Sequence, residues 1–457
     1  MGFLPPELLH MIMDEVGGEL HTILRCRLVN RTFAAVAIPF AFKTIVIKKT
    51  FIKERSGVTF EDLSTRLGIT KYVKRIVYDA EGIVIPYVEQ NQHIKEIRKN
   101  STDKANKASC IATFAPGFDQ DNELPKVKQV TEFIDVMVEE FNVFHRFKNL
   151  ESLSILFPWF RWGYEGYYGY DDGPNSPFFS NVDTRLQVAI LEALESVYVE
   201  HASPFHLKTF ELRNVMPYPM EALTSEGLQS MLKQITSLSI AVYPRHPYPD
   251  DVKPEDNSKG SIYARFAHTI AALMRPLENL ESLRYCDDLG ADEAINERWE
   301  QWDTLYFPRL KCLRFERIAF DQGAFELGSG GEIVAYHAAG IVATDFLLRH
   351  KATLEEVHME ECYMRDTDIW KWEQVFDDIR DELENLTTFT FEPRPGPDKE
   401  GRLYNGYRYV AEFGFDYPET HMAENMNYDE EDVEGELEAL RSLQEVVSER
   451  RIARFAG

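Results

Sequence analysis

The sequence has few cysteines, no long apolar segment and fewer basic than acidic residues. Its five cysteines are scattered, odd in number and form no Cys-x-x-Cys pair, which is typical of a protein in a reducing compartment. No stretch approaches the roughly 18 uninterrupted apolar residues of a membrane span. The chain does not open with a basic segment followed by an apolar one either. We therefore expect no membrane segment, no secretory signal, and a cytoplasmic or nuclear location.

The charge balance excludes some classes of partner. The chain carries 50 basic and 76 acidic side chains, which gives a net charge of −26. A field of this sign works against binding to nucleic acid or to an anionic membrane surface. We expect neither nucleic acid nor membrane as a partner.

The common catalytic motifs are also missing. The chain contains no Gly-x-x-x-x-Gly-Lys-Ser/Thr, no Gly-x-Ser-x-Gly and no His-Glu-x-x-His segment. The segment "HMEEC" has side chains that can bind metals. However, His358 lies between Val357 and Met359, which occupy apolar strand positions, so a solvent-facing strand residue is favoured over a ligand. We expect no catalytic residue, no cofactor and no metal, and predict that the chain is not an enzyme.

What the chain does have is a repeated motif. At 457 residues it exceeds the roughly 250–300 residues of a single core, so several domains or an elongated repeat architecture are expected. The motif is L-x-x-L-x-φ, where φ is apolar, and its copies begin 28 to 77 residues apart. The eight copies begin at Val73, Leu150, Leu207, Ile235, Leu280, Leu310, Leu354 and Leu386.

The motif predicts a strand, and several intervals between copies have helical periodicity. Two apolar positions two residues apart are typical of a strand. Three intervals predict helices: "VTEFIDVMVEEFNVFHRF", "RLQVAILEALESVYVEH" and "IVAYHAAGIVATDFLLRH". Units of helix and strand in constant order predict an α/β fold with parallel strands inside and helices outside. The motif resembles the core of leucine-rich repeats, but its spacing exceeds their 20–29 residues, so we expect an irregular solenoid with insertions.

Two insertions and a terminal helix follow from composition. Residues 158–180 are rich in aromatics, glycine and proline, and residues 243–261 are rich in proline and polar residues, so both are predicted loops. Asn405 and Gly406 lie between strand-like aromatic flanks, which predicts a tight hairpin. Residues 425–457 begin with acids, end with arginines and carry an apolar stripe, which predicts a helix that caps the last repeat.

The N-terminal region has a different pattern. Pro5 and Pro6 favour a helix start, and the apolar residues that follow, among them Leu8, Leu9 and Ile12, form a broad stripe. Gly17 and Gly18 end this helix, and a second helical apolar pattern continues beyond them. So much apolar surface on a helix of about three turns must be covered by neighbouring helices, by another protein, or by both.

This region resembles the F-box, a three-helix motif that opens with Leu-Pro and Glu-Leu-Leu and later contains Leu-Val-x-x-x-Phe. The matching residues are Leu4, Pro5, Glu7, Leu8, Leu9, Ile12, Leu28, Val29, Asn30, Arg31, Phe33, Pro39, and Phe40 or Phe42. The order of an N-terminal F-box and leucine-rich-like repeats is similar to that of many fungal F-box proteins. We predict an F-box-like motif over residues 1–47, a repeat domain over 48–424 and the capping helix over 425–457.

The resemblance implies a substrate receptor of a Skp-cullin-F-box ubiquitin ligase, bound to a Skp-type adaptor and through it to a cullin. It implies that the adaptor contacts come from Leu4, Pro5, Leu8, Leu9, Ile12, Leu28, Val29 and Phe33. The alternative is that Leu8, Ile12, Leu28 and Phe33 pack only on each other and on the first repeat. Two other functions stay open, a repeat scaffold for protein–protein interaction without a ligase and an enzyme with an unrecognised site on the concave face.

The resemblance also implies that the repeats hold an unknown protein substrate. Aromatic residues are enriched at binding hot spots, and loops on a rigid scaffold often carry function. The predicted loop at 158–180 is therefore our candidate for substrate recognition, through Trp159, Trp162, Tyr164, Tyr167, Tyr168 and Tyr170. The alternative is that this loop folds back and covers the edge of the solenoid.

Overall fold

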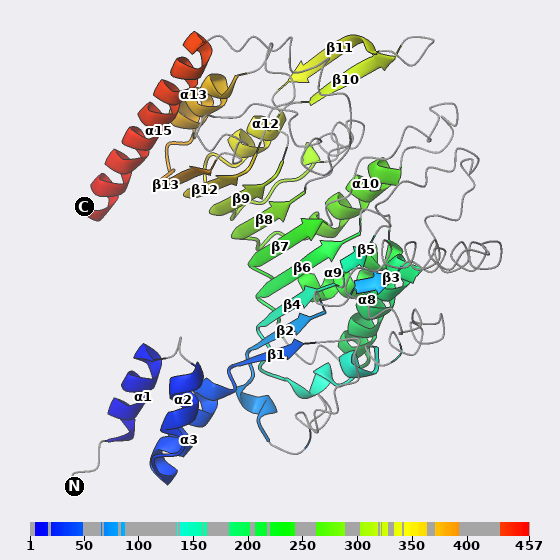
Figure 1. Ribbon diagram of the computed structural model, residues 1–457, viewed down its shortest axis with the longest axis vertical. Coiled ribbons are helices and arrows are strands. Elements are labelled where there is room, and N and C mark those ends of the chain that lie inside the picture. Colours follow the sequence, from blue (N-terminus) through cyan, green and yellow to red (C-terminus); the bar gives the residue numbers. More distant parts are fainter. Residues whose placement is uncertain are drawn as a thin grey trace, which may run out of the picture. The chain divides into compact units, whose positions relative to one another are not determined.

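The chain folds as two units, each of α/β type with parallel strands. The first unit comprises Met1–Met216, Met220–Ile235 and Pro249–Glu255, and the second comprises Pro217–Pro219, Thr236–Tyr248 and Asp256–Gly457. A computed structural model describes residues 5–16, 20–48, 65, 68–80, 84–86, 135, 138–157, 159–161, 182–201, 206–216, 220–242, 262–287, 302–318, 320, 322–327, 333–340, 342–362, 371–392 and 430–456 (Figure 1).

Three helices occupy the N-terminal region of the first unit. They are α1 (Pro6–Glu15), α2 (Leu20–Cys26) and α3 (Arg31–Ala41). A proline at the first position starts α1, where its missing N–H costs no intrahelical bond. The side chain of Asn30 caps α3, since its Oδ1 accepts the backbone N–H of Phe33 at 2.9 Å.

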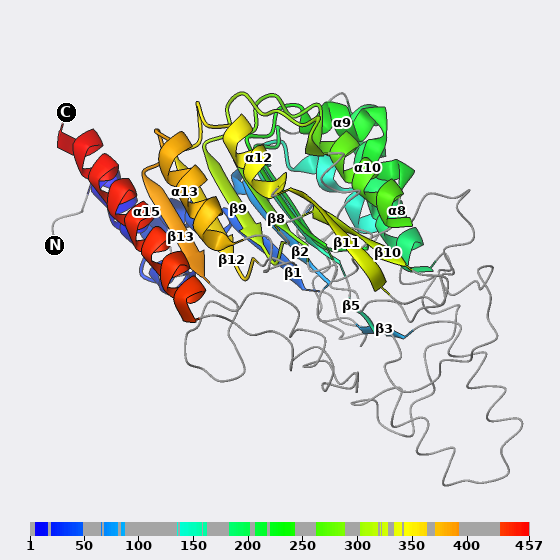
Figure 2. The ribbon, with the colours of Figure 1, turned by 90° about the horizontal axis from the view of Figure 1, so that it is seen from above.

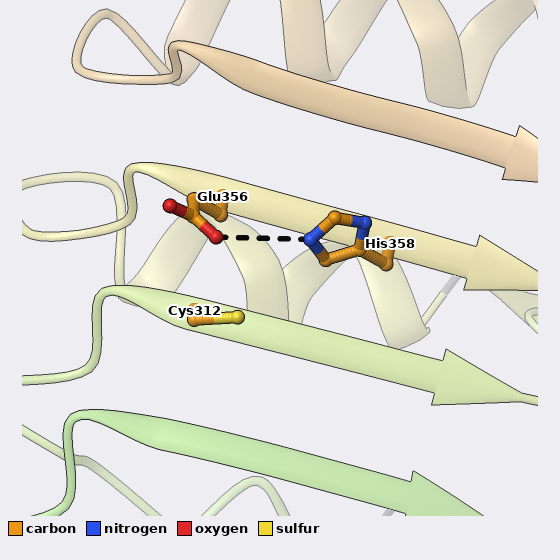
Figure 3. A group of neighbouring side chains, drawn as sticks. All are labelled: Cys312, Glu356 and His358. Carbon is orange, nitrogen blue, oxygen red and sulfur yellow. Dashed lines mark ion pairs between the residues drawn. The ribbon is translucent and has the colours of Figure 1, made fainter. Parts of the chain in front are cut away.

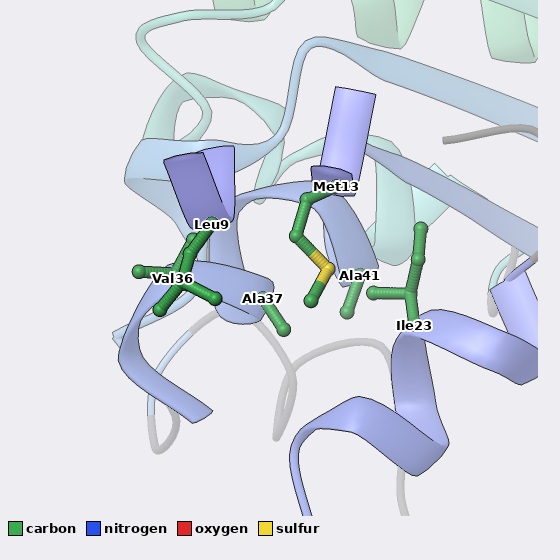
Figure 4. Packing of buried hydrophobic residues seen from close by; sticks show 6 residues of the cluster. All are labelled: Leu9, Met13, Ile23, Val36, Ala37 and Ala41. Atoms are coloured by element: carbon green, nitrogen blue, oxygen red, sulfur yellow. The ribbon is translucent and has the colours of Figure 1, made fainter. Parts of the chain in front are cut away.

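These helices share a small apolar core, in which α3 contacts both α1 and α2. Figure 4 shows the buried side chains of the cluster: Leu9, Met13, Ile23, Val36, Ala37 and Ala41. Each of them is buried, at most 7 % exposed, and the partly buried Val16, Cys26, Phe33, Phe40 and Phe42 pack against the cluster. Other apolar side chains of the same region, among them Leu8, Met11 and Leu28, stay outside this core.

Parallel strands form the centre of the first unit. Their order in the sheet is β1 (Thr44–Lys48), β2 (Arg75–Asp79), β4 (Ser152–Leu156) and β6 (Thr209–Val215). A separate parallel pair consists of β3 (Val84–Pro86) and β5 (Trp159–Arg161). The described part of the unit's repeats includes the helical elements η1 (Thr70–Tyr72), η2 (Phe144–Arg146), α8 (Val182–Glu200), η4 (Glu221–Thr224) and α9 (Glu226–Leu232).

In the second unit, the described residues form five parallel strands in the order β7 (Ser237–Val242), β8 (Ser282–Cys286), β9 (Cys312–Glu316), β12 (Glu356–Glu360) and β13 (Thr388–Glu392). The helices found among its described residues are α10 (Ile262–Met274), α12 (Val342–Arg349), α13 (Trp372–Glu382) and α15 (Glu430–Ala456). Figure 2 shows α12 and α13 on one face of this unit's strands. An antiparallel hairpin joins β10 (Gln322–Leu327) to β11 (Ile333–Gly340).

The predicted repeat is confirmed, because each of the eight motif copies contains a strand that starts at its third position. The side chain at position 1 is at most 1 % exposed in every copy. Positions 4 and 6 are also buried, apart from Phe391 in the last copy, which is half-buried. A ninth copy that the sequence analysis missed, "FKTIVI" from Phe42, forms β1 and pairs with β2.

The backbone at position 2 sets the register between successive strands. Its carbonyl oxygen accepts two N–H groups from the next repeat; Glu151, for example, accepts those of Lys208 at 2.7 Å and Thr209 at 3.0 Å. The same arrangement recurs at Lys43, Lys74, Thr236, Glu281, Lys311 and Glu355. Equal positions of successive copies therefore lie side by side across each unit's strands.

The predicted C-terminal helix is α15, which packs on α13 and β13. Leu443 and Val447 of its predicted apolar stripe are buried, and Leu437 and Leu440 are half-buried. Arg450 donates hydrogen bonds to the carbonyl oxygens of Arg380 and Leu383 at the end of α13, at 2.8 and 2.9 Å. These bonds satisfy carbonyl groups that have no partner within α13.

One predicted helix is wrong in its first half. The run "IVAYHAAGIVATDFLLRH" forms β11 over Ile333–Gly340 and only then α12. The β-branched residues Ile333 and Val334 favour extended backbone, and pairing with β10 satisfies the N–H and C=O groups of this segment. The helix predicted from "RLQVAILEALESVYVEH" is confirmed, because α8 contains the whole run except His201. Of the run "VTEFIDVMVEEFNVFHRF", the structure describes residues 135 and 138–147, which are helical at 135 and 138–141 and then form η2 over Phe144–Arg146.

Other predictions lie outside the described residues. These are the loop at 243–261, the hairpin at Asn405–Gly406, and residues 158 and 162–180 of the aromatic loop. At the start of that loop, residues 159–161 form β5 rather than irregular backbone.

Candidate functional site

Exposed apolar side chains are concentrated on the N-terminal helices. Leu9 and Met13 of α1 turn into the core, whereas Leu8, Met11 and Ile12 are 45, 64 and 42 % exposed. Spacings of three and four residues place these three side chains on one face of the helix. Six of the eleven large apolar side chains found exposed among the described residues lie between Leu8 and Val29.

A second exposed apolar group follows α2. Leu28 is 85 % and Val29 63 % exposed, although both lie in a turn held by backbone hydrogen bonds. The backbone N–H of Leu28 donates to Arg25 at 2.9 Å and that of Val29 to Cys26 at 3.1 Å, directly before the Asn30 cap. Two apolar side chains therefore point into solvent from an ordered backbone. Exposure of apolar surface to water is unfavourable, and burial within the chain does not remove it here.

The predicted adaptor residues separate into two sets. Leu8, Ile12, Leu28 and Val29 are exposed, and Pro5 is exposed just before α1. Leu9 is buried and Phe33 is half-buried against the same helical core, so both stabilise the three helices. Leu4 lies outside the described residues.

The predicted substrate-binding residues are mostly not described. Trp159 lies in β5. The remaining five, Trp162, Tyr164, Tyr167, Tyr168 and Tyr170, lie outside the described part of the chain.

The second unit presents a polar sheet face opposite its apolar one. Side chains at repeat positions 4 and 6 pack inward, so positions 3, 5 and 7 project from the other face. Position 5 is occupied in turn by Ser239, Arg284, Arg314, His358 and Thr390. Because equal positions are in register, these side chains form one row across the five strands.

Ion pairs connect this row to position 7. Arg284 makes two hydrogen bonds to Glu316, at 2.7 and 2.8 Å, and Arg314 Nε lies 2.5 Å from the same carboxylate. Arg314 also bonds Glu360. Burial by itself raises the pKa of Glu316, but the hydrogen bonds and charge of Arg284, together with Arg314, outweigh it and lower the pKa. The positive charges of the two arginines and the negative charges of the two glutamates therefore neutralise one another on this face.

A mixed group of side chains lies beside these ion pairs. Cys312 is opposite Glu356 in the register of β9 and β12, and His358 follows Glu356 on the same face. Figure 3 shows all three side chains in front of the sheet, with helices behind it. The Sγ, a carboxylate oxygen and an imidazole nitrogen all lie within 4.8 Å of one another. Burial first, and then the charge of Glu356, raise the pKa of the Cys312 thiol.

The cysteine of the "HMEEC" segment is not part of this group. Cys362 is 2 % exposed, and its thiol donates to the carbonyl oxygens of Phe315 at 3.4 Å and Glu360 at 3.7 Å. Burial raises the pKa of this thiol to about 12. His358 projects from the polar sheet face at intermediate exposure, as the strand pattern predicted, and its thiol neighbour comes from another repeat.

The proximity of Cys312 and Glu356 was not predicted from the sequence. They are 44 residues apart in the chain, so no linear motif joins them. The signal was present in the repeat itself, because both residues occupy position 3 of successive copies. Alignment of the copies, followed by the rule that equal positions lie side by side in a parallel sheet, would have brought them together.

Comparison with models of known protein families and with curated proteins finds no match for this chain. Among the helices of the described residues, none has both the length and the apolar content that a membrane crossing requires.

Proposed function

We propose that the chain is the substrate receptor of a Skp-cullin-F-box ubiquitin ligase. In this proposal the three N-terminal helices are the F-box-like part and bind a Skp-type adaptor, which connects the chain to a cullin. The repeats form an irregular leucine-rich-like solenoid that holds a protein substrate. The chain itself is not catalytic: it brings the substrate close to the ligase, so that transfer becomes effectively intramolecular. Its place would be the cytoplasm or the nucleus.

The observation that carries the proposal is the exposure of Leu8, Ile12, Leu28 and Val29 on an ordered backbone. Burying a leucine-sized side chain at an interface is worth roughly 1.5–3 kcal/mol. The buried residues of the same helices form their own core, so the exposed ones are available to a partner without unfolding the region. The resemblance of the sequence to the F-box names the class of partner.

The repeat domain supports the proposal that the repeats hold a protein substrate. Its described strands present a broad polar face, and the chain's net charge of −26 favours a basic segment on the substrate.

The test is a binding titration of the full chain with a purified Skp-type adaptor. Leu28→Asp is expected to weaken binding roughly 10- to 150-fold, because it removes a contact worth 1.5–3 kcal/mol. Val199→Asp is the matched control, since Val199 is also an exposed apolar helix residue, 61 % exposed on α8. Equal binding by the Leu28 variant and the wild type would refute the assigned surface. No binding by a folded wild-type chain would favour a repeat scaffold without a ligase.

A further inference from the structure

The side chains of Cys312, Glu356 and His358 contain the donor types of a transition-metal site. Their potential ligand atoms all lie within 4.8 Å of one another on the polar face of the second unit, and the Nε2 of His358 is 3.8 Å from Oε2 of Glu356. Zinc bonds of 2.0–2.3 Å in tetrahedral geometry place ligand atoms about 3.3–3.8 Å apart. Separations of up to 4.8 Å require these atoms to move together by up to about 1.5 Å, through rotation of the side chains.

We propose that Cys312, Glu356 and His358 bind a zinc ion through one sulfur, one oxygen and one nitrogen. This site goes beyond the proposed receptor function and does not depend on it. The combination of thiolate and imidazole favours Zn²⁺ over Mg²⁺ or Ca²⁺, which prefer oxygen ligands. Binding replaces the S–H bond of Cys312 with a sulfur–metal bond, and the proton goes to solvent.

The surroundings orient the histidine for this role. The Nδ1 of His358 lies 2.8 Å from Oγ1 of Thr390 on the next strand, which leaves Nε2 directed towards Glu356. A hydrogen bond on the second ring nitrogen is the usual support of a metal-binding histidine. Thr390 is therefore a positioning residue in this proposal.

The neighbouring charges are compatible with a cation. Arg314 lies opposite His358 across β9 and β12, but its guanidinium pairs with Glu316 and Glu360. Glu356 supplies a negative charge to the ion, and Cys312 a second one once it is deprotonated. Three protein ligands leave the fourth tetrahedral position to water or to a side chain of a bound protein.

The experiment uses the full chain, kept reduced, and titrates it with Co²⁺, which replaces Zn²⁺ and reports its ligands by absorption. We expect one equivalent of Co²⁺ to give a thiolate-to-cobalt charge-transfer band together with the visible bands of a tetrahedral ion, and Zn²⁺ to abolish both. Cys312→Ser should remove the charge-transfer band. Cys286→Ser should keep it, because Cys286 lies on the neighbouring strand β8 outside the group.

Further variants keep the test decisive if Cys312→Ser does not fold. Glu356→Gln and His358→Asn change side chains on the sheet face that are not part of the apolar core, and each should weaken Co²⁺ binding at least about 10-fold. Thr390→Val should weaken it about 10-fold while the absorption spectrum at saturation stays unchanged. Absence of the charge-transfer band in the wild type, or its persistence in a folded Cys312→Ser variant, would overturn the proposal.

Discussion

Glu436 on α15 accepts the backbone N–H of Trp372, the first residue of α13, with an Oε1–N distance of 3.0 Å. Both residues are nearly fully buried, at 2 and 1 % exposure. Arg450 of the same helix binds the carbonyl oxygens at the other end of α13. Helix α15 thus places a carboxylate at the N-terminus of α13 and a guanidinium group at its C-terminus. This arrangement of charges is favourable for the dipole of α13.

We predict that Glu436→Ala lowers the free energy of unfolding by about 1–3 kcal/mol, because a buried N–H loses its acceptor. Glu436→Gln should cost less, since the amide oxygen still accepts the bond. The control is Glu438→Ala, an exposed acid two residues along α15. Urea unfolding followed by circular dichroism measures all three. A loss in Glu438→Ala as large as in Glu436→Ala would contradict the assignment.

His350 gives a prediction about protonation. It is 1 % exposed, its Nε2 accepts the backbone N–H of Phe307 at 2.9 Å, and its Nδ1 lies 2.8 Å from the carbonyl oxygen of Phe346. The ring is therefore neutral, with the proton on Nδ1. Burial lowers its pKa from 6.5 to about 4.

The unfolded chain takes up this proton near pH 6.5 and the folded chain only near pH 4. The contribution of His350 to stability is thus fully present above pH 6.5 and decreases by about 3 kcal/mol as the pH falls to 4. Nitrogen-15 correlation spectra of the imidazole at pH 6 should show the Nδ1–H form. A protonated ring, or the Nε2–H form, would contradict the hydrogen bonds assigned to it.

Glu316 tests the ion pairs of the sheet face. Its side chain is 9 % exposed and binds Arg284 and Arg314, so Glu316→Gln should lower the free energy of unfolding at neutral pH by about 1–3 kcal/mol. The folded-state pKa is below 4.5, so the wild-type advantage is present above that pH and is lost as the pH falls through the folded-state value.

The matched control for this prediction is Glu392→Gln, which changes an exposed glutamate at the same repeat position on β13. It should leave stability nearly unchanged at every pH. If the difference between wild type and Glu316→Gln does not shrink in acid, the carboxylate does not stabilise the fold through its charge.

The strands were predictable from sequence, whereas the neighbour relations on their polar face were not. Strand positions such as Leu153 and Ile155 are apolar in every repeat because they face the helices, so the motif itself records the strand. The segment from Ile333 was wrongly predicted as helix. Strand β11 and helix α12 follow each other closely in one apolar run, so the sequence pattern shows no boundary between them. Cys312 and Glu356 became neighbours only through the register of β9 and β12.

In the N-terminal region, too, the sequence predicted the elements but not the contacts between them. The pattern predicted an apolar stripe on α1, and the stripe separates into a buried side with Leu9 and Met13 and an exposed side with Leu8 and Ile12. Sequence alone could not assign each residue to its side, because that depends on how α3 packs between α1 and α2. The exposed side is the one on which the proposed function depends.

The proposed function depends on the binding of an adaptor to this exposed apolar surface. The most direct measurement is the molar mass, by light scattering on a size-exclusion column, of the full chain mixed with an equimolar Skp-type adaptor. We expect one species with the mass of a one-to-one complex. With the double variant Leu8→Asp, Leu28→Asp in place of the wild type, we expect two separate components. Two separate peaks with the folded wild-type chain would contradict the proposed function.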